Sequence, residues 1–136
     1  MNHNYKSIAE QFGQTLDADN FVAFRALLHP ECVYQFRNIM MNGPAEIAGS
    51  YEKNMVEGKK KLDKLVWGKA RIEEVSERVF DVHFTDYLGH QGIEHTYRCK
   101  QRGTVHEKGS VIRIEHIDDP VESEKLKAFY EKVGLG

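Results

Sequence analysis

The change of hydrophobic period along the chain constrains the fold more than any other feature of the sequence. Up to about residue 62, apolar residues recur mostly at three- and four-residue steps, and from Lys64 onward they alternate at every second residue. The first period is typical of helices packed through one face, and the second is typical of strands with one buried face. The sequence therefore predicts helices first, then a sheet, then a last helix that begins near Pro120.

Three helices are predicted in the first part of the chain. The first covers about residues 4–16, with its apolar residues on one face. Asp17 or Asp19 is suited to cap the second helix, and Pro30 ends it. The third helix begins at Pro44, because a proline at the first helical position loses no hydrogen bond.

Five strands and a fourth helix complete the expected elements. One strand, 32–37, precedes the third helix, and four follow it at 65–75, 79–88, 93–106 and 111–117. The turns between the last four are short, so neighbouring strands should pair antiparallel. Asp119 can cap the final helix, with Glu122 three residues on, and Gly134 is suited to the position just past its end.

Composition narrows the classes of function. A chain of 136 residues with this pattern predicts a single domain, residues 1–136, large enough to bury a core. The net charge of −2 gives no electrostatic basis for nucleic-acid binding. No apolar run reaches the roughly 18 residues of a membrane-spanning helix. The first residues lack the apolar segment of a signal peptide, so a cytoplasmic location is expected.

No metal or cofactor motif occurs in the sequence. Cys32 and Cys99 are too far apart for the spacing of a zinc site or a redox pair, and both fall in predicted strands, which favours reduced thiols. Clustered histidine, cysteine and carboxylate ligands, phosphate-binding loops and dinucleotide fingerprints are all missing from the sequence. We therefore predict neither a metal nor a cofactor.

Four short segments carry a family resemblance: 16–19 (Leu-Asp-Ala-Asp), His29-Pro30, 43–47 (Gly-Pro-Ala-Glu-Ile) and 112–120. Together with the order of elements, they resemble the nuclear transport factor 2-like (SnoaL-like) superfamily over nearly the whole chain. The resemblance implies an α+β fold in which a curved, mostly antiparallel sheet wraps three N-terminal helices as a cone with an apolar pocket. It also implies a homodimer formed through the outer face of the sheet.

One activity of that superfamily is disfavoured by the residues. An ungapped alignment through 16–19 places Phe12 and Phe36 where the related ketosteroid isomerases carry a tyrosine donor and an aspartate base. Phenylalanine neither donates a hydrogen bond to an enolate nor takes up a proton.

The last predicted strand carries the candidate catalytic residues. Alternation places His116 and Asp118 on the same face as Ile112 and Ile114, with His116 and Asp118 about 7 Å apart at Cα. The acid–base residues of SnoaL-like cyclases occupy interior strands of this kind, so the pair is a candidate catalytic set. In the alternative interpretation, Asp118 helps to cap the last helix and His116 is a half-exposed strand residue.

The remaining candidate ligand-binding residues are Tyr34, His95, Tyr97, Phe12, Phe36 and Trp67. Two functions stay open. The first is a cofactor-free acid–base isomerase, dehydratase, cyclase or hydrolase that acts on an apolar or aromatic metabolite. The alternative is a non-catalytic ligand-binding or homodimeric interaction module. A cavity of roughly 300 Å³ or more with convergent polar groups would favour the first.

Overall fold

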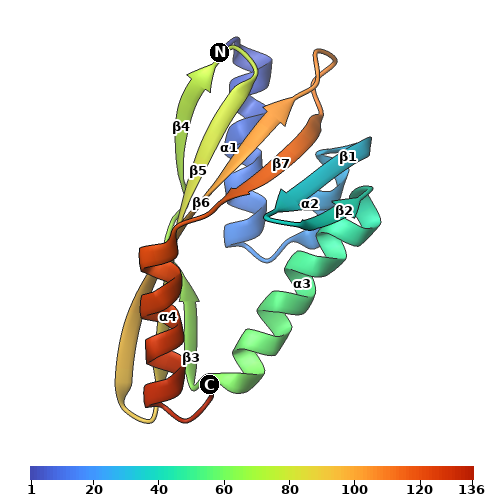
Figure 1. Ribbon diagram of the computed structural model, residues 1–136. Coiled ribbons are helices and arrows are strands. Elements are labelled where there is room, and N and C mark those ends of the chain that lie inside the picture. The colour runs from blue at the N-terminus through green and yellow to red at the C-terminus, as the bar shows by residue number, and fades with distance from the viewer.

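The computed structural model describes residues 1–136 and contains four helices and a seven-stranded sheet (Figure 1). The elements are α1 (His3–Asp17), α2 (Phe21–Ala26), β1 (Leu28–Phe36), β2 (Ile39–Asn42), α3 (Pro44–Lys61), β3 (Lys64–Trp67), β4 (Arg71–Ser76), β5 (Val79–His90), β6 (Ile93–Val105), β7 (Val111–Ile117) and α4 (Pro120–Lys132). Their order and types confirm the predicted α+β class.

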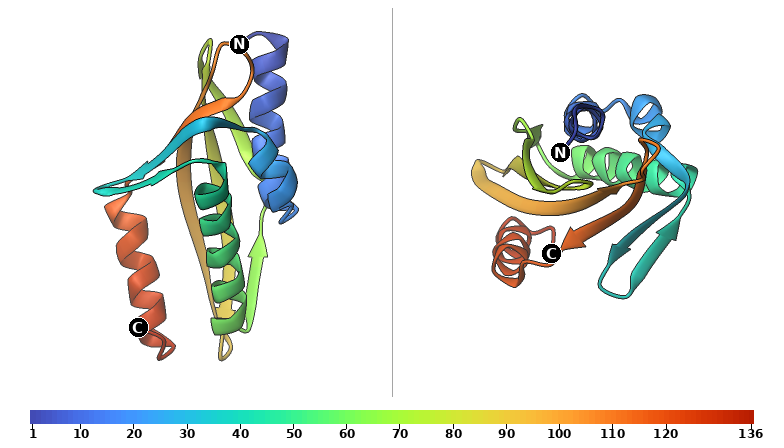
Figure 2. Two further views of the ribbon diagram at one scale, coloured as in Figure 1. Left: turned by 90° about the vertical axis from the view of Figure 1, so that its right-hand side faces the viewer. Right: turned by 90° about the horizontal axis from the view of Figure 1, so that it is seen from above.

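The sheet has the strand order β2-β1-β7-β6-β5-β3, and β4 also pairs with β5. Strands β5, β6 and β7 form the predicted antiparallel meander, while β1 pairs with β7 in parallel. Seen from above, the sheet curves past α1, α2 and α3, which lie on one side of it (Figure 2). This is the predicted arrangement of a curved, mostly antiparallel sheet around three helices.

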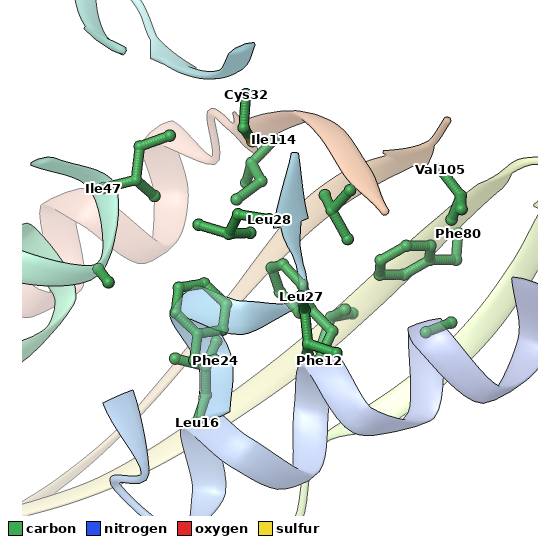
Figure 3. Packing of buried hydrophobic residues seen from close by; sticks show 14 residues of the cluster. Phe12, Leu16, Phe24, Leu27, Leu28, Cys32, Ile47, Phe80, Val105 and Ile114 are labelled. Carbon is green, nitrogen blue, oxygen red and sulfur yellow. The ribbon is translucent and has the colours of Figure 1, made fainter. Parts of the chain in front are cut away.

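The main core lies where α1 and α2 meet the sheet (Figure 3). The ring of Phe12 packs edge-on against Phe24 and Phe80, with centroid distances of 5.1 and 5.4 Å. Phe12 has no solvent exposure and lines none of the larger cavities. Its position on the buried face of α1 thus places Phe12 inside the core and outside the described cavity walls.

A second, smaller core holds α4 on the sheet. Phe129 of α4 and Val133, just past its end, pack with Leu62 and Leu88, all nearly inaccessible to solvent. The carboxylate of Asp119 accepts a hydrogen bond from the Glu122 N–H, which confirms the predicted cap of this helix. None of the four helices has the length and apolar character needed to cross a membrane.

Four local predictions differ from the structure. Pro30 does not end the second helix, because α2 ends at Ala26 and Pro30 lies inside β1. Asn20, and neither Asp17 nor Asp19, caps α2, because its side chain accepts from the Ala23 N–H. The predicted strand 65–75 is two strands, β3 and β4, separated at residues 68–70. The short strand β2 was not predicted, and it pairs with β1 through a two-residue turn in which Arg37 has a left-handed φ of 54°.

Candidate functional site

A cavity of about 380 Å³ lies between the two cores. Its wall comes from the end of α1, from α3, from strands β3, β5 and β6, and from α4. Most of the wall is apolar, including Leu16, Phe21, Met55, Leu65, Phe84 and Leu126. Its volume exceeds the value set above for a ligand site, and polar groups converge on it from several elements.

Asp86 is the most exceptional polar group in this wall. It continues the core-facing alternation of β5, in which Phe80 and Val82 are fully buried. The register of the sheet places it directly between Trp67 of β3 and Tyr97 of β6. Its carboxyl group has no hydrogen-bond or ion-pair partner in the protein, and burial, reinforced by the charge of Asp17, raises its pKa to about 7.

Two further carboxylates belong to the segment that ends α1. Oδ2 of Asp17 accepts a hydrogen bond of 2.9 Å from the Ala70 N–H. Burial raises the pKa of Asp17, although the Ala70 hydrogen bond and nearby Lys69 act in the opposite direction. Both carboxylate oxygens of Asp19 have partners. Oδ1 accepts a hydrogen bond of 2.7 Å from the Trp67 indole N–H, and Oδ2 pairs with Nζ of Lys59 at 3.0 Å.

A chain of hydrogen bonds leads away from the cavity. The hydroxyl of Tyr51 donates to the Oε1 atom of Gln101, and Nε2 of Gln101 lies 3.3 Å from Nδ1 of His116. Burial raises the pKa of Tyr51 well above its usual value and lowers the pKa of His116. At neutral pH both groups are therefore uncharged, and the chain fixes the direction of the Tyr51 hydroxyl.

His116 faces a neighbouring depression of about 430 Å³, which shares Tyr51, Tyr97 and Gln101 with the first cavity. Tyr34 and Phe36 line the same depression, and the Phe36 ring packs edge-on against the His116 ring at 4.6 Å. The first cavity, called the inner cavity below, and this depression, called the outer hollow, are thus adjacent. Tyr51 and Tyr97 lie between them. Burial raises the pKa of Tyr97 to about 12.

Asp118 lies outside both hollows. Its exposed carboxylate forms two hydrogen bonds with the Arg37 guanidinium, at 2.8 and 3.1 Å, and this contact lowers the pKa of Asp118. The structure therefore does not bring His116 and Asp118 together in one cavity wall. The reason is that the chain leaves β7 after Ile117, so the alternation of the strand no longer sets the direction of Asp118.

The other sequence-predicted site residues divide between three places. Trp67 and Tyr97 line the inner cavity, and Tyr34 and Phe36 line the outer hollow. His95 lines neither hollow: its ring stacks on Phe129 of α4 at 5.3 Å, with Nε2 buried and unpartnered.

Sequence reasoning missed Asp86, although the signal for it was present. Phe80, Val82 and Phe84 occupy every second position of β5 and define its core-facing side. Asp86 is the next residue in that alternation. A carboxylate that falls on the apolar, core-facing side of a strand is a candidate for a buried, functional acid.

No protein-family model and no curated protein matches the sequence of this chain. Solved structures do match its fold. A candidate polyketide cyclase from Xanthomonas campestris has a TM-score of 0.69 at 9% identity, covering 96% of both chains. An LEH-like epoxide hydrolase from M. tuberculosis has a TM-score of 0.66 at 14% identity, covering 98% of this chain and 97% of its own.

A third similar structure is TerC co-crystallized with polyporic acid, with a TM-score of 0.66 at 15% identity over 90% of this chain and 97% of its own. Identities this low establish a shared fold and no shared activity. The fold is that of the nuclear transport factor 2-like superfamily, as the resemblance implied.

Proposed function

We propose that this chain, which has the fold of the SnoaL-like pocket proteins, is a cofactor-free acid–base enzyme that acts on an apolar or aromatic metabolite. The reaction class is isomerisation, dehydration, ring closure or hydrolysis. One observation carries the proposal: Asp86 is a partly buried carboxyl group without a protein partner, in the wall of a ligand-sized cavity, with its pKa raised to about 7.

The proposed role of Asp86 is to take a proton from the substrate and return it at a second position. A group with a pKa near neutrality suits this task, because both its forms are populated at neutral pH. Burial in an apolar wall also keeps bulk water from competing for the proton.

Two tyrosines can support this step. Tyr97 and Tyr130 line the same cavity, and their hydroxyl groups make no hydrogen bond within the protein. Their pKa values are raised by burial, so both hydroxyls stay protonated at neutral pH. A protonated hydroxyl can donate to a substrate oxygen as negative charge develops on it.

His116 with Asp118 stays a competing assignment of the acid–base pair. His116 faces the outer hollow and carries a lowered pKa, which suits a base, but Asp118 is engaged by Arg37 at the surface. The two assignments predict different variants to be inactive, so one experiment separates them.

The test is deuterium exchange from D₂O into the acidic C–H positions of a panel of aromatic and alicyclic ketones, followed by NMR. We expect the wild-type protein to accelerate exchange for some members, and Asp86→Asn to reduce the rate about 100-fold or more. Asp118→Asn and His116→Ala should retain the wild-type rate within a few-fold. Full activity in Asp86→Asn would overturn the role of Asp86, and its loss in the other two variants would favour the competing pair.

The second candidate is a non-catalytic ligand-binding or interaction module, favoured by the largely apolar cavity wall. Panel members that bind without any exchange would support it. We also propose a cytoplasmic location and, as the resemblance implies, a homodimer. Light scattering at tens of micromolar protein checks the dimer, and a monomeric mass would contradict it.

A further inference from the structure

The inner cavity has carboxylates in its wall but no positively charged side chain. Asp17, Asp19 and Asp86 line it, and no lysine, arginine or histidine does. Lys59 approaches Asp19 from outside the wall and neutralises it. Asp17 and Asp86 form no ion pair, although Lys69 lies near Asp17, so the cavity wall carries net negative charge when both are ionised.

The wall leaves several hydrogen-bond acceptors free, beside the free hydroxyl donors of Tyr97 and Tyr130. The Tyr51 hydroxyl hydrogen is used by Gln101, which leaves the Tyr51 oxygen as an acceptor, and the Trp67 N–H is used by Asp19. Both oxygens of Asp86 and Oδ1 of Asp17 also accept no hydrogen bond from the protein. A ligand group that satisfies these acceptors must therefore bring donors.

Aromatic side chains flank the unpaired carboxyl group on both sides. Trp67 and Tyr97 are the cross-strand neighbours of Asp86, which places their side chains about 5 Å away at Cβ on the same face of the sheet. Phe21, Tyr51, Phe84 and Tyr130 complete the aromatic part of the wall. Aromatic faces attract organic cations, and more strongly where water is excluded.

We propose that the ligand of this cavity is a protonated amine carried on an apolar or aromatic scaffold, with its ammonium group against Asp86 between Trp67 and Tyr97. The inference rests on the proposed function in one respect, that the cavity binds a small molecule. It adds the chemical class of that molecule: an organic cation, in preference to a neutral ketone or a carboxylate.

The bound cation also selects the role of Asp86. A positive charge beside a carboxyl group favours its ionised form, so an ammonium group lowers the pKa of Asp86 on binding. At neutral pH the complex then holds Asp86 as a carboxylate. In that state Asp86 acts as a base toward a C–H or O–H group of the same ligand.

The test uses three probes on one scaffold: 2-phenylethylamine, 2-phenylethanol and phenylacetate, which are cationic, neutral and anionic at neutral pH. Isothermal titration at pH 8 should give the amine an affinity about tenfold or more above that of the alcohol, because ion pairs in a desolvated wall are strong. Phenylacetate should bind most weakly. Asp86→Asn should remove the preference for the amine, and the control Glu10→Gln, at an exposed carboxylate of α1 outside both hollows, should keep it.

The affinity for the amine should also depend on pH. The groups that face Asp86 are Asp17 from α1, Tyr97 and Cys99 from β6, and Tyr130 from α4. The phenols and the thiol have raised pKa values and stay neutral between pH 6 and 8, and the amine stays protonated. The fraction of ionised Asp86 rises about tenfold over this range, so the amine affinity should rise by up to that factor.

Three results would overturn the inference. Equal or tighter binding of the alcohol or of phenylacetate would show a cavity that does not select cations, and would leave the proposed acid–base function standing. Amine binding unchanged in Asp86→Asn would place the amine elsewhere. Binding of none of the probes would also reject the amine class, and the deuterium-exchange rates would then decide separately whether the proposed function fails.

Discussion

At the scale of single residues, two aspartates of β5, the buried Asp81 and the partly buried Asp86, show that partners decide the state of a carboxyl group. Asp81 is only 3% exposed, yet its pKa is lowered, because Arg102 donates two hydrogen bonds to it at 2.8 and 3.1 Å. Asp86 has no such partner, and burial raises its pKa to about 7. The first arrangement stabilises the fold and the second costs stability, which is typical of functional groups.

Replacing Asp86 should make the protein more stable. The raised pKa means that the folded state holds a proton that the unfolded state releases between about pH 4 and 7, so ionised Asp86 destabilises the fold most above pH 7. Asp86→Asn should raise the free energy of unfolding at pH 8 by on the order of 2 to 4 kcal/mol. The gain should shrink as the pH falls from 7 to 4. Urea denaturation across this range is the measurement, and a loss of stability at pH 8 would contradict the argument.

Breaking the Asp81–Arg102 pair should have the opposite effect. Arg102→Ala leaves the buried Asp81 carboxylate with only Lys100, at 3.8 Å, and should lower the free energy of unfolding at pH 7 by about 2 kcal/mol. Because the pKa of Asp81 is lowered, the contribution of the pair is present above about pH 4 and is lost as Asp81 becomes protonated.

The matched control for Arg102→Ala is Arg37→Ala, which breaks a pair of similar geometry at the surface. Exposed ion pairs are screened by water, so this variant should unfold at nearly the wild-type urea concentration. Equal losses in both variants would show that burial does not set the value of the pair.

At the scale of elements, periodicity predicted the helices and the β5–β6–β7 meander because each buries one regular face. It missed the break between β3 and β4, where the carboxylate of Asp17 takes the Ala70 N–H, a long-range contact with no local signature. It also missed β2. The turn before β2 places Arg37 in a left-handed conformation, and no glycine, the usual sequence signal for such a turn, occurs there.

Two glycines test how tightly the elements pack. A Cβ atom on Gly103 of β6 would lie 2.3 Å from the Phe80 ring, so Gly103→Ala should lower the free energy of unfolding by about 1 to 3 kcal/mol. Gly49 of α3 is exposed and has no atom near such a Cβ, so Gly49→Ala should raise it by about 0.5 to 1 kcal/mol. Thermal unfolding of both variants checks the pair, and destabilisation by Gly49→Ala would contradict the second expectation.

At the scale of the whole molecule, the cavity exists because the sheet is held by two separate cores, one around Phe12 and one around Phe129. The resemblance predicted such a cavity, and alternation predicted that Tyr97 faces inward. The sequence did not predict how the wall divides into two hollows, because that depends on the path of α3 and α4 across the sheet. For the same reason, the alternation of β6 alone placed His95 in the cavity, although α4 covers the His95 side chain.

The indole of Trp67 lies in the cavity wall, bonded to Asp19 and next to Asp86 across the sheet, and the chain has no other tryptophan. All tryptophan fluorescence of the protein therefore originates beside the proposed binding site. A ligand that enters the cavity changes the polarity around this one fluorophore, so its emission wavelength and intensity report occupancy without any label. The phenyl probes do not absorb at the wavelengths that excite an indole selectively. The emission of Trp67 can therefore be used to follow their binding.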